Sequence, residues 1–206
     1  MNKRDEKLLK IFENVTDDPK IVESIIQLQN NINIHGNAKV IGVSSPKNDV
    51  TTLVAAKAIA EVYAMQNQPT LIIDCNMYNS LLQHYYGDIK KYLNDLNDSS
   101  KSPLSLAKNL NKNLGIIVSK NTTYPSEVFL SDSFHQLLEE AKGHYEHVVM
   151  ILPSIINHND IITLKNDLTA AVLVARKKQT KREDLFDSIE LLKNYNVPYI
   201  GTIFMK

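Results

Sequence analysis

Six short apolar runs, rich in β-branched residues, recur along the chain and alternate with stretches of helical character. We expect strands at residues 39–44, 70–75, 114–119, 147–152, 170–175 and 199–205, and helices at 51–66, 132–142 and 181–194. Nearly continuous apolar strands are typical of a parallel sheet that is buried on both faces. The alternation therefore predicts an α/β fold with a doubly wound, mostly parallel sheet, right-handed crossovers and flanking helices.

The expected domain covers residues 1–206, with 1–35 as an N-terminal helical segment and 87–113 as an irregular segment rich in Asn, Asp, Ser and Lys. Asp18 before Pro19 has the pattern of a helix N-cap followed by proline at the first helical position. The apolar residues that follow share one helical face and are expected to pack against the domain or a neighbour: Ile21, Ile25, Leu28 and Ile32.

Composition narrows the functional classes. The 206 residues suit one α/β domain with a sizeable core, and 23 basic residues balance 23 acidic ones, which gives no electrostatic reason to expect a nucleic-acid partner. No run approaches the roughly 18 apolar residues of a membrane span, and the charged N-terminus lacks the apolar core of a signal peptide. A single cysteine excludes an internal disulfide framework, so a cytoplasmic location is expected.

Residues 40–55 have the pattern of a strand, a phosphate-binding loop and a helix. Such a loop reads G-x-x-x-x-G-K-[ST], because its glycines let successive backbone N–H groups surround phosphate oxygens and its lysine neutralises them. Here no glycine occurs between Gly42 and Gly87. The segment therefore has the arrangement of a nucleotide-binding loop without the residues that hold phosphate.

Several motifs around this loop resemble one family. They are Ser45-Pro46-Lys47 after the first strand, the strand 70–74, Tyr124-Pro125-Ser126-Glu127 and the strand 146–150. From about Ile21 to Lys206 the chain resembles the ATPase domain of the bacterial tyrosine kinases that control capsule and exopolysaccharide synthesis. These kinases are relatives of the partition and septum-site ATPases with a deviant Walker A loop, so the resemblance implies a P-loop NTPase-like fold.

In that family the loop reads S-x-x-P-G-E-G-K-[ST]-T-T. The spacing from its serine to the aspartate of the next strand equals the spacing from Ser45 to Asp74, so the alignment needs no gap. The resemblance then implies that every essential Walker A position is replaced. The proline, the two glycines, the lysine and the magnesium-binding hydroxyl align, in this order, with Asn48, Asp49, Thr51, Thr52 and Leu53.

Two further motifs of the family are altered in the same way. The second acidic motif, a strand ending in D-A-D, aligns with Asp74-Cys75-Asn76, which keeps the first carboxylate and replaces the second with an amide. The metal-linked carboxylate of Walker B aligns with Ile151. The resemblance thus implies no catalytic residue, no metal and no ATP, with Lys47 and Asp74 as the candidates for residual nucleotide or ion contacts. We interpret Lys47 as a surface charge of the loop and Asp74 as a structural cap.

The N-terminal helix of the family carries E-x-x-R-x-x-R, a polar interface that closes ring-shaped oligomers. The matching positions here are Glu23, Ile26 and Gln29. Because both arginines are missing, the charge-assisted contacts of such an interface are absent. We therefore expect a monomer or a dimer.

The sequence favours a catalytically inactive tyrosine-kinase-like protein, a pseudokinase that acts through protein contacts in the regulation of capsular or exopolysaccharide synthesis. The resemblance implies a protein partner, either the cytoplasmic tail of a membrane polysaccharide co-polymerase, which would recruit the protein to the inner face of the membrane, or an active paralogous kinase. Two alternatives stay open. One is an active protein-tyrosine kinase that uses ATP and magnesium through an altered loop, and the other is a relative of the partition or septum-site ATPases.

Overall fold

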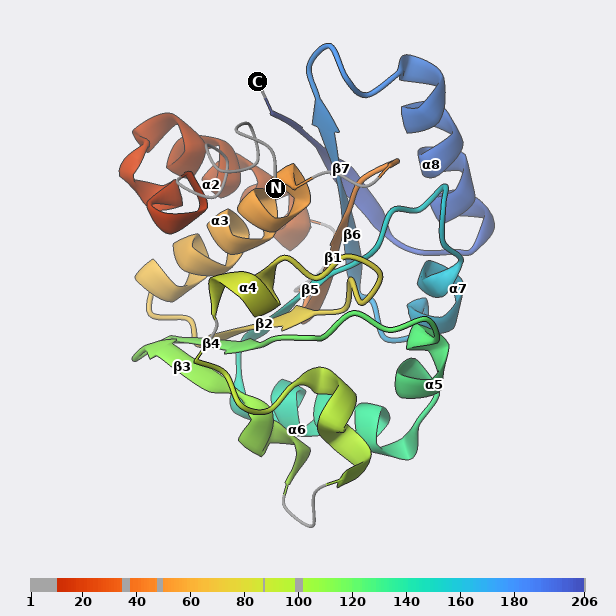
Figure 1. The fold of residues 1–206 in the computed structure, drawn as a ribbon. Coiled ribbons are helices and arrows are strands. Elements are labelled where there is room, and N and C mark those ends of the chain that lie inside the picture. The colour runs from red at the N-terminus through yellow and green to blue at the C-terminus, as the bar shows by residue number, and fades with distance from the viewer. Residues whose placement is uncertain (1–10, 35–37, 48–49, 87, 99–101, 206) are drawn as a thin grey trace.

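The computed structural model describes residues 11–34, 38–47, 50–86, 88–98 and 102–205. Its centre is a seven-stranded sheet in the order β3-β4-β2-β5-β1-β6-β7 (Figure 1). The parallel strands are β1 (Val40–Ser44), β2 (Thr70–Asp74), β4 (Leu114–Ile117), β5 (His147–Ile151), β6 (Ala170–Arg176) and β7 (Tyr199–Met205). The predicted α/β fold class and all six predicted strands are confirmed, with strand ends within two residues of the expected ones.

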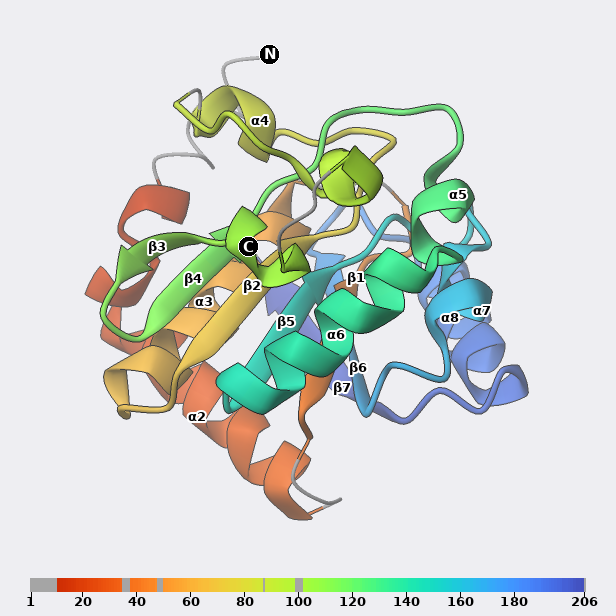
Figure 2. The same cartoon turned by 90° about the horizontal axis from the view of Figure 1, so that it is seen from below.

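Helices cover both faces of this sheet. One face carries α2 (Pro19–Ile34), the 3-10 turn η1 (Val15–Asp17) before it, α3 (Thr51–Met65) and α4 (Leu82–Tyr85). The other carries α5 (Pro125–Phe129), α6 (Asp132–His144), α7 (Asp160–Leu164) and α8 (Arg182–Asn194). In Figure 2, α6 crosses in front of β5, while α2 and α3 lie behind the sheet. The three long predicted helices after β1 are confirmed, whereas α4, α5 and α7 are too short for helical periodicity to reveal them.

The expectation that residues 87–113 are irregular is wrong for part of this segment. Strand β3 (Lys108–Asn111) pairs antiparallel with β4 at the edge of the sheet. Asn and Lys have low strand propensity, so the pattern gave no signal, and pairing with the open edge of β4 decides the conformation. Two 3-10 helices, η2 (Leu93–Asp98) and η3 (Pro103–Leu106), contact α6 and bury leucines there.

Helix α2 begins at Pro19, as predicted, and Asp18 Oδ1 accepts a hydrogen bond from the Lys20 N–H at 3.0 Å. The predicted apolar face is also confirmed. Its residues are buried or partly buried against the core that α2 shares with α3: Ile21, Ile25, Leu28 and Ile32.

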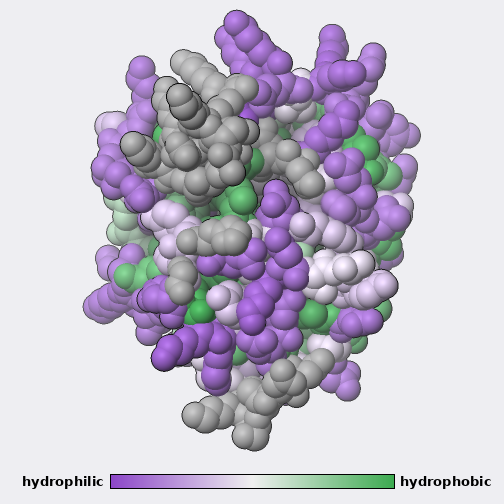
Figure 3. All heavy atoms as spheres, in the orientation of Figure 1, coloured by the Kyte–Doolittle hydropathy of each residue, from purple (hydrophilic) through white to green (hydrophobic). Residues whose placement is uncertain are grey.

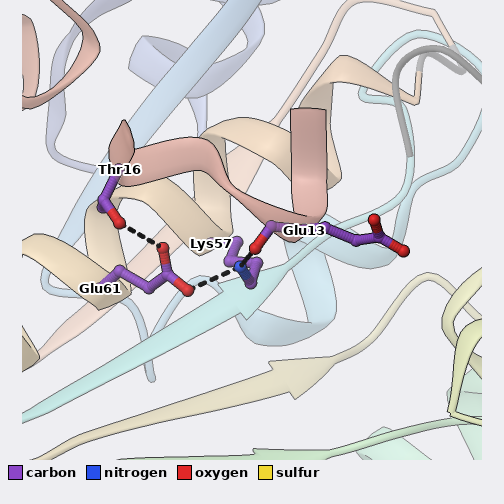
Figure 4. A network of polar contacts seen from close by, with 4 residues as sticks. All are labelled: Glu13, Thr16, Lys57 and Glu61. Carbon is purple, nitrogen blue, oxygen red and sulfur yellow. Dashed lines mark hydrogen bonds and ion pairs between the residues drawn. The ribbon is translucent and has the colours of Figure 1, made fainter. Parts of the chain in front are cut away.

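Helix α3 contains a lysine that is only 6% exposed, Lys57. Its ammonium contacts Glu61 Oε1 at 2.6 Å and the Glu13 carbonyl oxygen at 3.2 Å, and it lies 5.0 Å from the centroid of the Phe12 ring. Glu61 Oε2 accepts a hydrogen bond from Thr16 Oγ1 at 3.2 Å (Figure 4). A buried cation needs such partners, and these partners join the N-terminal segment to α3.

The C-terminus of α3 has a Schellman motif. Asn67 adopts a φ of 59°, its N–H donates to the Ala64 carbonyl, and the Gln68 N–H donates to the Tyr63 carbonyl, both at 3.1 Å. Asparagine tolerates this left-handed conformation better than most residues. Helix α8 ends in the same way at Asn196, with a φ of 58°. The motif fixes the direction in which Gln68 leaves α3.

The face of the molecule seen in Figure 3 is mostly hydrophilic, and its hydrophobic residues form small, separated areas. Exposed large apolar side chains lie on different elements and include Ile34, Met65, Leu130 and Phe204. Within the described ranges, no helix combines the length and the apolar character needed to cross a bilayer.

Gly42 in β1 allows two leucines to pack closely on the sheet. A Cβ at this position would approach Leu152 Cδ1 at 2.8 Å and Leu168 Cδ2 at 3.0 Å. We expect Gly42→Ala to lower the free energy of unfolding by about 1–3 kcal/mol, because both buried leucines must move. Gly201→Ala in β7 is the matched control, since a Cβ there meets nothing within 4 Å. Urea unfolding measures both variants, and equal stabilities would contradict the packing argument.

Candidate functional site

The carboxyl ends of β1, β2 and β5 meet at one edge of the sheet, where open α/β sheets commonly bind ligands. Strand β5 lies between the other two, so Ile151 is paired with Val43 of β1 and with Asp74 of β2. The backbone N–H of Cys75 donates to the Ile151 carbonyl at 2.9 Å. The fold thus brings the predicted Walker A segment, the second acidic motif and the Walker B position together.

Helix α3 begins at Thr51, so Thr52 and Leu53, at the expected lysine and magnesium-ligand positions, lie in its first turn. The three residues of this first turn are buried, with exposed fractions of 1% for Thr51, 4% for Thr52 and 5% for Leu53. Asn48 and Asp49 lie outside the described residues. The first turn of α3 therefore presents buried hydroxyls and an apolar side chain where a nucleotide site would hold phosphate and metal.

The hydroxyls of the loop are bonded within the protein. Thr52 Oγ1 donates to Ser45 Oγ at 3.0 Å, and Ser45 Oγ donates to the Lys47 carbonyl at 2.7 Å. Ser44 Oγ donates to the Pro153 carbonyl at 2.6 Å. The residues after β5 also bond to the loop, because the N–H of Ile155 donates to the Ser45 carbonyl at 3.1 Å. These contacts hold the loop against the segment that follows β5.

Lys47 points to a different part of the molecule. Its ammonium forms an ion pair with Asp184 Oδ2 of α8 at 2.8 Å, and its side chain is 54% exposed. Lys47 thus lies at the surface and is paired with α8. An exposed pair of this kind contributes little to stability, but it directs the lysine toward the first turn of α8.

Asp74 is fully buried and serves as a local acceptor. Its Oδ1 accepts from the Asn76 N–H at 3.0 Å, and its Oδ2 accepts from Ser80 Oγ at 2.6 Å. Burial raises the pKa of Asp74 to about 6, although hydrogen bonds from Ser80, Asn76 and Ser119 oppose this rise. Both carboxylate oxygens of Asp74 therefore have partners within the segment that follows β2.

The rim of the site also includes residues that the sequence did not single out. The rings of Tyr78 and His158 stack with centroids 3.7 Å apart, and the Tyr78 hydroxyl lies 3.5 Å from Asp160 Oδ1. Burial raises the pKa of Asp160. The buried oxygens that lack a hydrogen-bond partner within the part of the chain that the structure describes include Asn76 Oδ1, Ser154 Oγ and Asp160 Oδ2. No motif could reveal this rim, since Tyr78 and Asp160 are 82 residues apart.

The described residues at this edge offer few groups that could hold a magnesium nucleotide. Polyphosphate binding needs cations and free N–H groups, whereas Lys47 is paired with Asp184 and the rim offers carboxyl and amide oxygens. Ile151, which is 1% exposed, has no group that can hold a metal. Within the described ranges, no cluster of three or more His, Cys, Asp or Glu side chains could bind a metal ion.

Comparison with curated proteins finds tyrosine-protein kinases. The chain is 24% identical over 166 residues to the kinase ptk of Acinetobacter johnsonii, 26% over 207 residues to the putative kinase CapB of Staphylococcus aureus, and 25% over 197 residues to the putative kinase EpsB of Ralstonia nicotianae. These alignments cover 79%, 93% and 92% of this chain. They cover 88% of CapB, but the chain spans only 23% of ptk and 26% of EpsB. No protein-family model matches the chain.

Solved structures agree with this relationship at the level of the fold. The kinase domain of VpsO superimposes with a TM-score of 0.81 at 19% identity, over 100% of this chain and 99% of that one. The Escherichia coli tyrosine kinase ETK gives 0.79 at 20% identity, over 89% and 74%, and the chimerical protein CapA2B2 gives 0.82 at 19%, over 94% and 88%. A ParA family ATPase from Chlorobium tepidum gives 0.58 at 18% identity, over 82% and 74%. The architecture is therefore that of the kinase domains more than that of the partition ATPases.

The raised pKa of Asp74 predicts a pH-dependent stability. Because the folded pKa of about 6 exceeds the ordinary value of 3.8, the stabilising contribution of the protonated form is complete only below the ordinary pKa and is lost as the pH rises through 6. Asp74→Asn removes this dependence. Between pH 4 and pH 7.5 the variant should gain about 2–2.5 kcal/mol in unfolding free energy relative to the native protein.

Urea unfolding at both pH values measures this difference, with Asp187→Asn on the exposed side of α8 as the control. A difference between Asp74→Asn and the native protein that stays constant with pH would contradict the raised pKa.

Proposed function

Since the chain is a relative of the capsule-type bacterial tyrosine kinases in the P-loop NTPase superfamily, we propose that it is a catalytically inactive member of this group. It acts through protein contacts in the regulation of capsular or exopolysaccharide synthesis. The observation that carries this proposal is the first turn of α3, where Thr52 bonds to Ser45 and Leu53 is buried.

The free energy of the missing phosphate contacts supports the loss of nucleotide binding. Each charge-assisted hydrogen bond to phosphate contributes about 1.5–3 kcal/mol. Without the lysine and the metal-binding hydroxyl, the loss is about 4 kcal/mol, which converts a micromolar dissociation constant to a millimolar one. The loop sequence also lacks the glycines that let backbone N–H groups surround an anion.

The Walker B position supports the loss of turnover as well. Phosphoryl transfer depends on a correctly held metal ion and on positioned carboxylates. Ile151 supplies no oxygen, and Asn76 offers an amide in place of the second carboxylate. Asp74, the remaining carboxylate, is already bonded to Ser80 and to the Asn76 N–H. Among the described residues at this edge, we therefore identify neither a metal site nor a base for this chemistry.

We assign the partner by the same relationship. It is the cytoplasmic tail of a membrane polysaccharide co-polymerase or an active paralogous kinase, and the protein works in the cytoplasm, at the inner face of the membrane when its partner recruits it. The α2 positions that match the ring interface support a different assembly from a ring. Gln29 is 3% exposed and bonds to Gln66 of its own chain, while Ile26 is 39% exposed.

The isolated protein should neither bind nor hydrolyse ATP at micromolar concentrations. Calorimetric titration with magnesium-ATP measures binding, and phosphate release measures hydrolysis. A dissociation constant below about 50 μM that depends on magnesium would overturn the proposal.

A repaired loop provides the positive control. A four-fold variant, with four substitutions in the loop, should regain nucleotide binding without kinase-like turnover. A six-fold variant, with two further substitutions outside the loop, should then hydrolyse ATP faster. The four changes are Asp49→Gly, Thr51→Gly, Thr52→Lys and Leu53→Ser, and the two further ones are Ile151→Asp and Asn76→Asp. Turnover by the four-fold variant alone would contradict the role given to Ile151. A folded six-fold variant that still binds no nucleotide would show that the alignment is wrong.

The α2 residues at the positions of the family's ring interface also predict the oligomeric state. With Ile26 exposed and Gln29 buried in place of two interface arginines, the protein should be a monomer or a dimer. Light scattering after gel filtration, over a range of protein concentrations, measures the mass. An octamer-sized species would show that another surface closes a ring.

A further inference from the structure

The turn between β6 and α8 concentrates positive charge in a chain whose charges balance overall. Five of the seven residues from Arg176 to Arg182 are Lys or Arg, whereas the whole chain has 23 basic and 23 acidic residues. Arg176 is buried, and the other four basic residues of this basic turn are exposed: Lys177, Lys178, Lys181 and Arg182. The basic turn projects beyond the end of the sheet in Figure 1, and Figure 3 shows hydrophilic side chains that project from the same place.

The lysines of the basic turn have open ammonium groups. None of the three forms an ion pair with a residue that the structure describes. Asp184, in the first turn of α8, is already paired with Lys47 at 2.8 Å. Glu183 and Asp187 remain exposed on α8, so the four exposed cations exceed the two open carboxylates beside them.

Three local features of the basic turn oppose stability. Lys178 has a φ of 66°, in the left-handed region that glycine and asparagine adopt more readily. Lys181 is the N-cap of α8, and its side chain makes no capping hydrogen bond, which Ser, Thr, Asp or Asn would supply. Arg182 places a cation at the positive end of the helix dipole. Residues that break local rules without a gain in stability are expected where function selects them.

Backbone contacts hold the basic turn in one conformation. The N–H groups of Gln179 and Thr180 donate to the Arg176 carbonyl at 3.1 and 2.9 Å, and the Arg176 N–H donates to Thr180 Oγ1 at 2.8 Å. The Lys177 N–H donates to the Met205 carbonyl at 2.8 Å, which joins the turn to the end of β7. The lysines therefore extend from an ordered backbone.

Two exposed aromatic rings lie beside the basic turn. Phe204, which is 71% exposed, pairs in the sheet with Ala175, one residue before the turn. The side chains on either side of Phe204 pack on the α2 face of the sheet, so Phe204 lies on the α8 face. Phe186 is 54% exposed, and its ring centroid lies 5.2 Å from the guanidinium carbon of Arg182. Exposed phenylalanines next to lysines are typical of segments that lie in a membrane interface.

The residue types distinguish between anionic partners. Recognition of a phosphorylated peptide favours arginines that hold phosphate in a bidentate manner, whereas three of the four exposed cations are lysines and Arg182 lies over Phe186. Lysines act as point charges and suit a diffuse anionic surface. A nucleic-acid duplex has the negative charge, but its phosphate backbone offers no apolar layer to the two exposed rings.

We propose that the basic turn, together with Phe186 and Phe204, is a contact site for the surface of an anionic lipid bilayer. The lysines lie among the headgroups, and the two rings enter the boundary between headgroups and acyl chains. The choice of a bilayer as the partner rests on the location proposed above, at the inner face of the membrane. The contact orients the molecule with the carboxyl ends of β6 and β7 toward the membrane.

Sedimentation of the protein with lipid vesicles tests the proposal. Vesicles of phosphatidylcholine with about 30% phosphatidylglycerol should bind the protein, and vesicles of phosphatidylcholine alone should bind it about tenfold more weakly. An increase in salt from about 0.1 M to about 0.5 M should release it, because screening shortens the range of the attraction. Equal binding to both kinds of vesicle, or binding to neither, would overturn the proposal. So would binding of duplex DNA or of a tyrosine-phosphorylated peptide through the same lysines without binding of vesicles.

Matched variants separate the membrane contact from folding. Lys178→Asn combined with Lys181→Ser supplies residues that suit the left-handed position and the N-cap, so the melting temperature should equal or exceed that of the native protein. Binding to anionic vesicles should fall by about tenfold or more, since each lysine near the membrane contributes about fivefold. Lys90→Gln combined with Lys91→Gln changes the net charge equally, on exposed residues between α4 and η2, and should leave binding unchanged. A folded Lys178→Asn, Lys181→Ser protein that keeps full vesicle binding would refute the site.

The contribution of the rings is measured separately. Phe204→Ser keeps the charge and should weaken vesicle binding several-fold without a change in its salt dependence. Unchanged binding of this variant would contradict the insertion of the ring. Vesicle binding is measured without nucleotide, so its failure would leave the proposal of an inactive kinase intact, and ATP binding by the protein would not alter the vesicle result.

Discussion

The burial of β1 between β5 and β6 is the constraint on which the rest of the structure depends. All five residues of β1 are buried, and parallel pairing to both neighbours satisfies the backbone. Parallel strands that are covered on both faces need continuous apolar sequence, and α2 and α3 on one side and α6 on the other provide the cover. Because the carboxyl ends of parallel strands meet at one edge of the sheet, this pairing also determines where a ligand-binding site can form.

The layout of a nucleotide-binding fold is therefore independent of its chemistry. The apolar strands and the helix that follows β1 determine the position of the loop, while the polar residues of the loop determine what it binds. Here Thr52 and Ser45 bond to each other, and Lys47 is engaged by α8. Part of this segment belongs to the core itself, because Leu53 packs in the cluster on the α3 face of the sheet and Thr51 and Thr52 are buried.

The two edges of the sheet differ in character. At the carboxyl edge a buried carboxyl group, Asp74, is bonded to its own neighbours and oxygens line the rim. At the amino edge the Schellman turn after α3 sets Gln68 beside His147, and Gln29 reaches inward from α2. Gln29 lies at a position that matches an arginine of the family's ring interface, and in this chain its side chain bonds to Gln66 beside a cavity at this edge.

The sequence by itself determined the elements whose buried apolar residues follow a recognisable pattern along the chain. These are the six parallel strands, the long helices, and the apolar face of α2 that contains Ile25 and Ile32. The spacing to Asp74, together with the family resemblance, also predicts that Thr52 and Leu53 occupy the positions of the Walker A lysine and metal-binding hydroxyl. Tertiary structure alone decided strand β3, which forms on the open edge of β4 against its own propensity.

Tertiary structure also decided the ion pair of Lys47 with Asp184 and the cavity that joins Gln29, Tyr63 and His147. The physical reason is that these contacts join side chains from distant segments. Their partners are set by packing in three dimensions, which leaves no periodic or short-range signal in the chain.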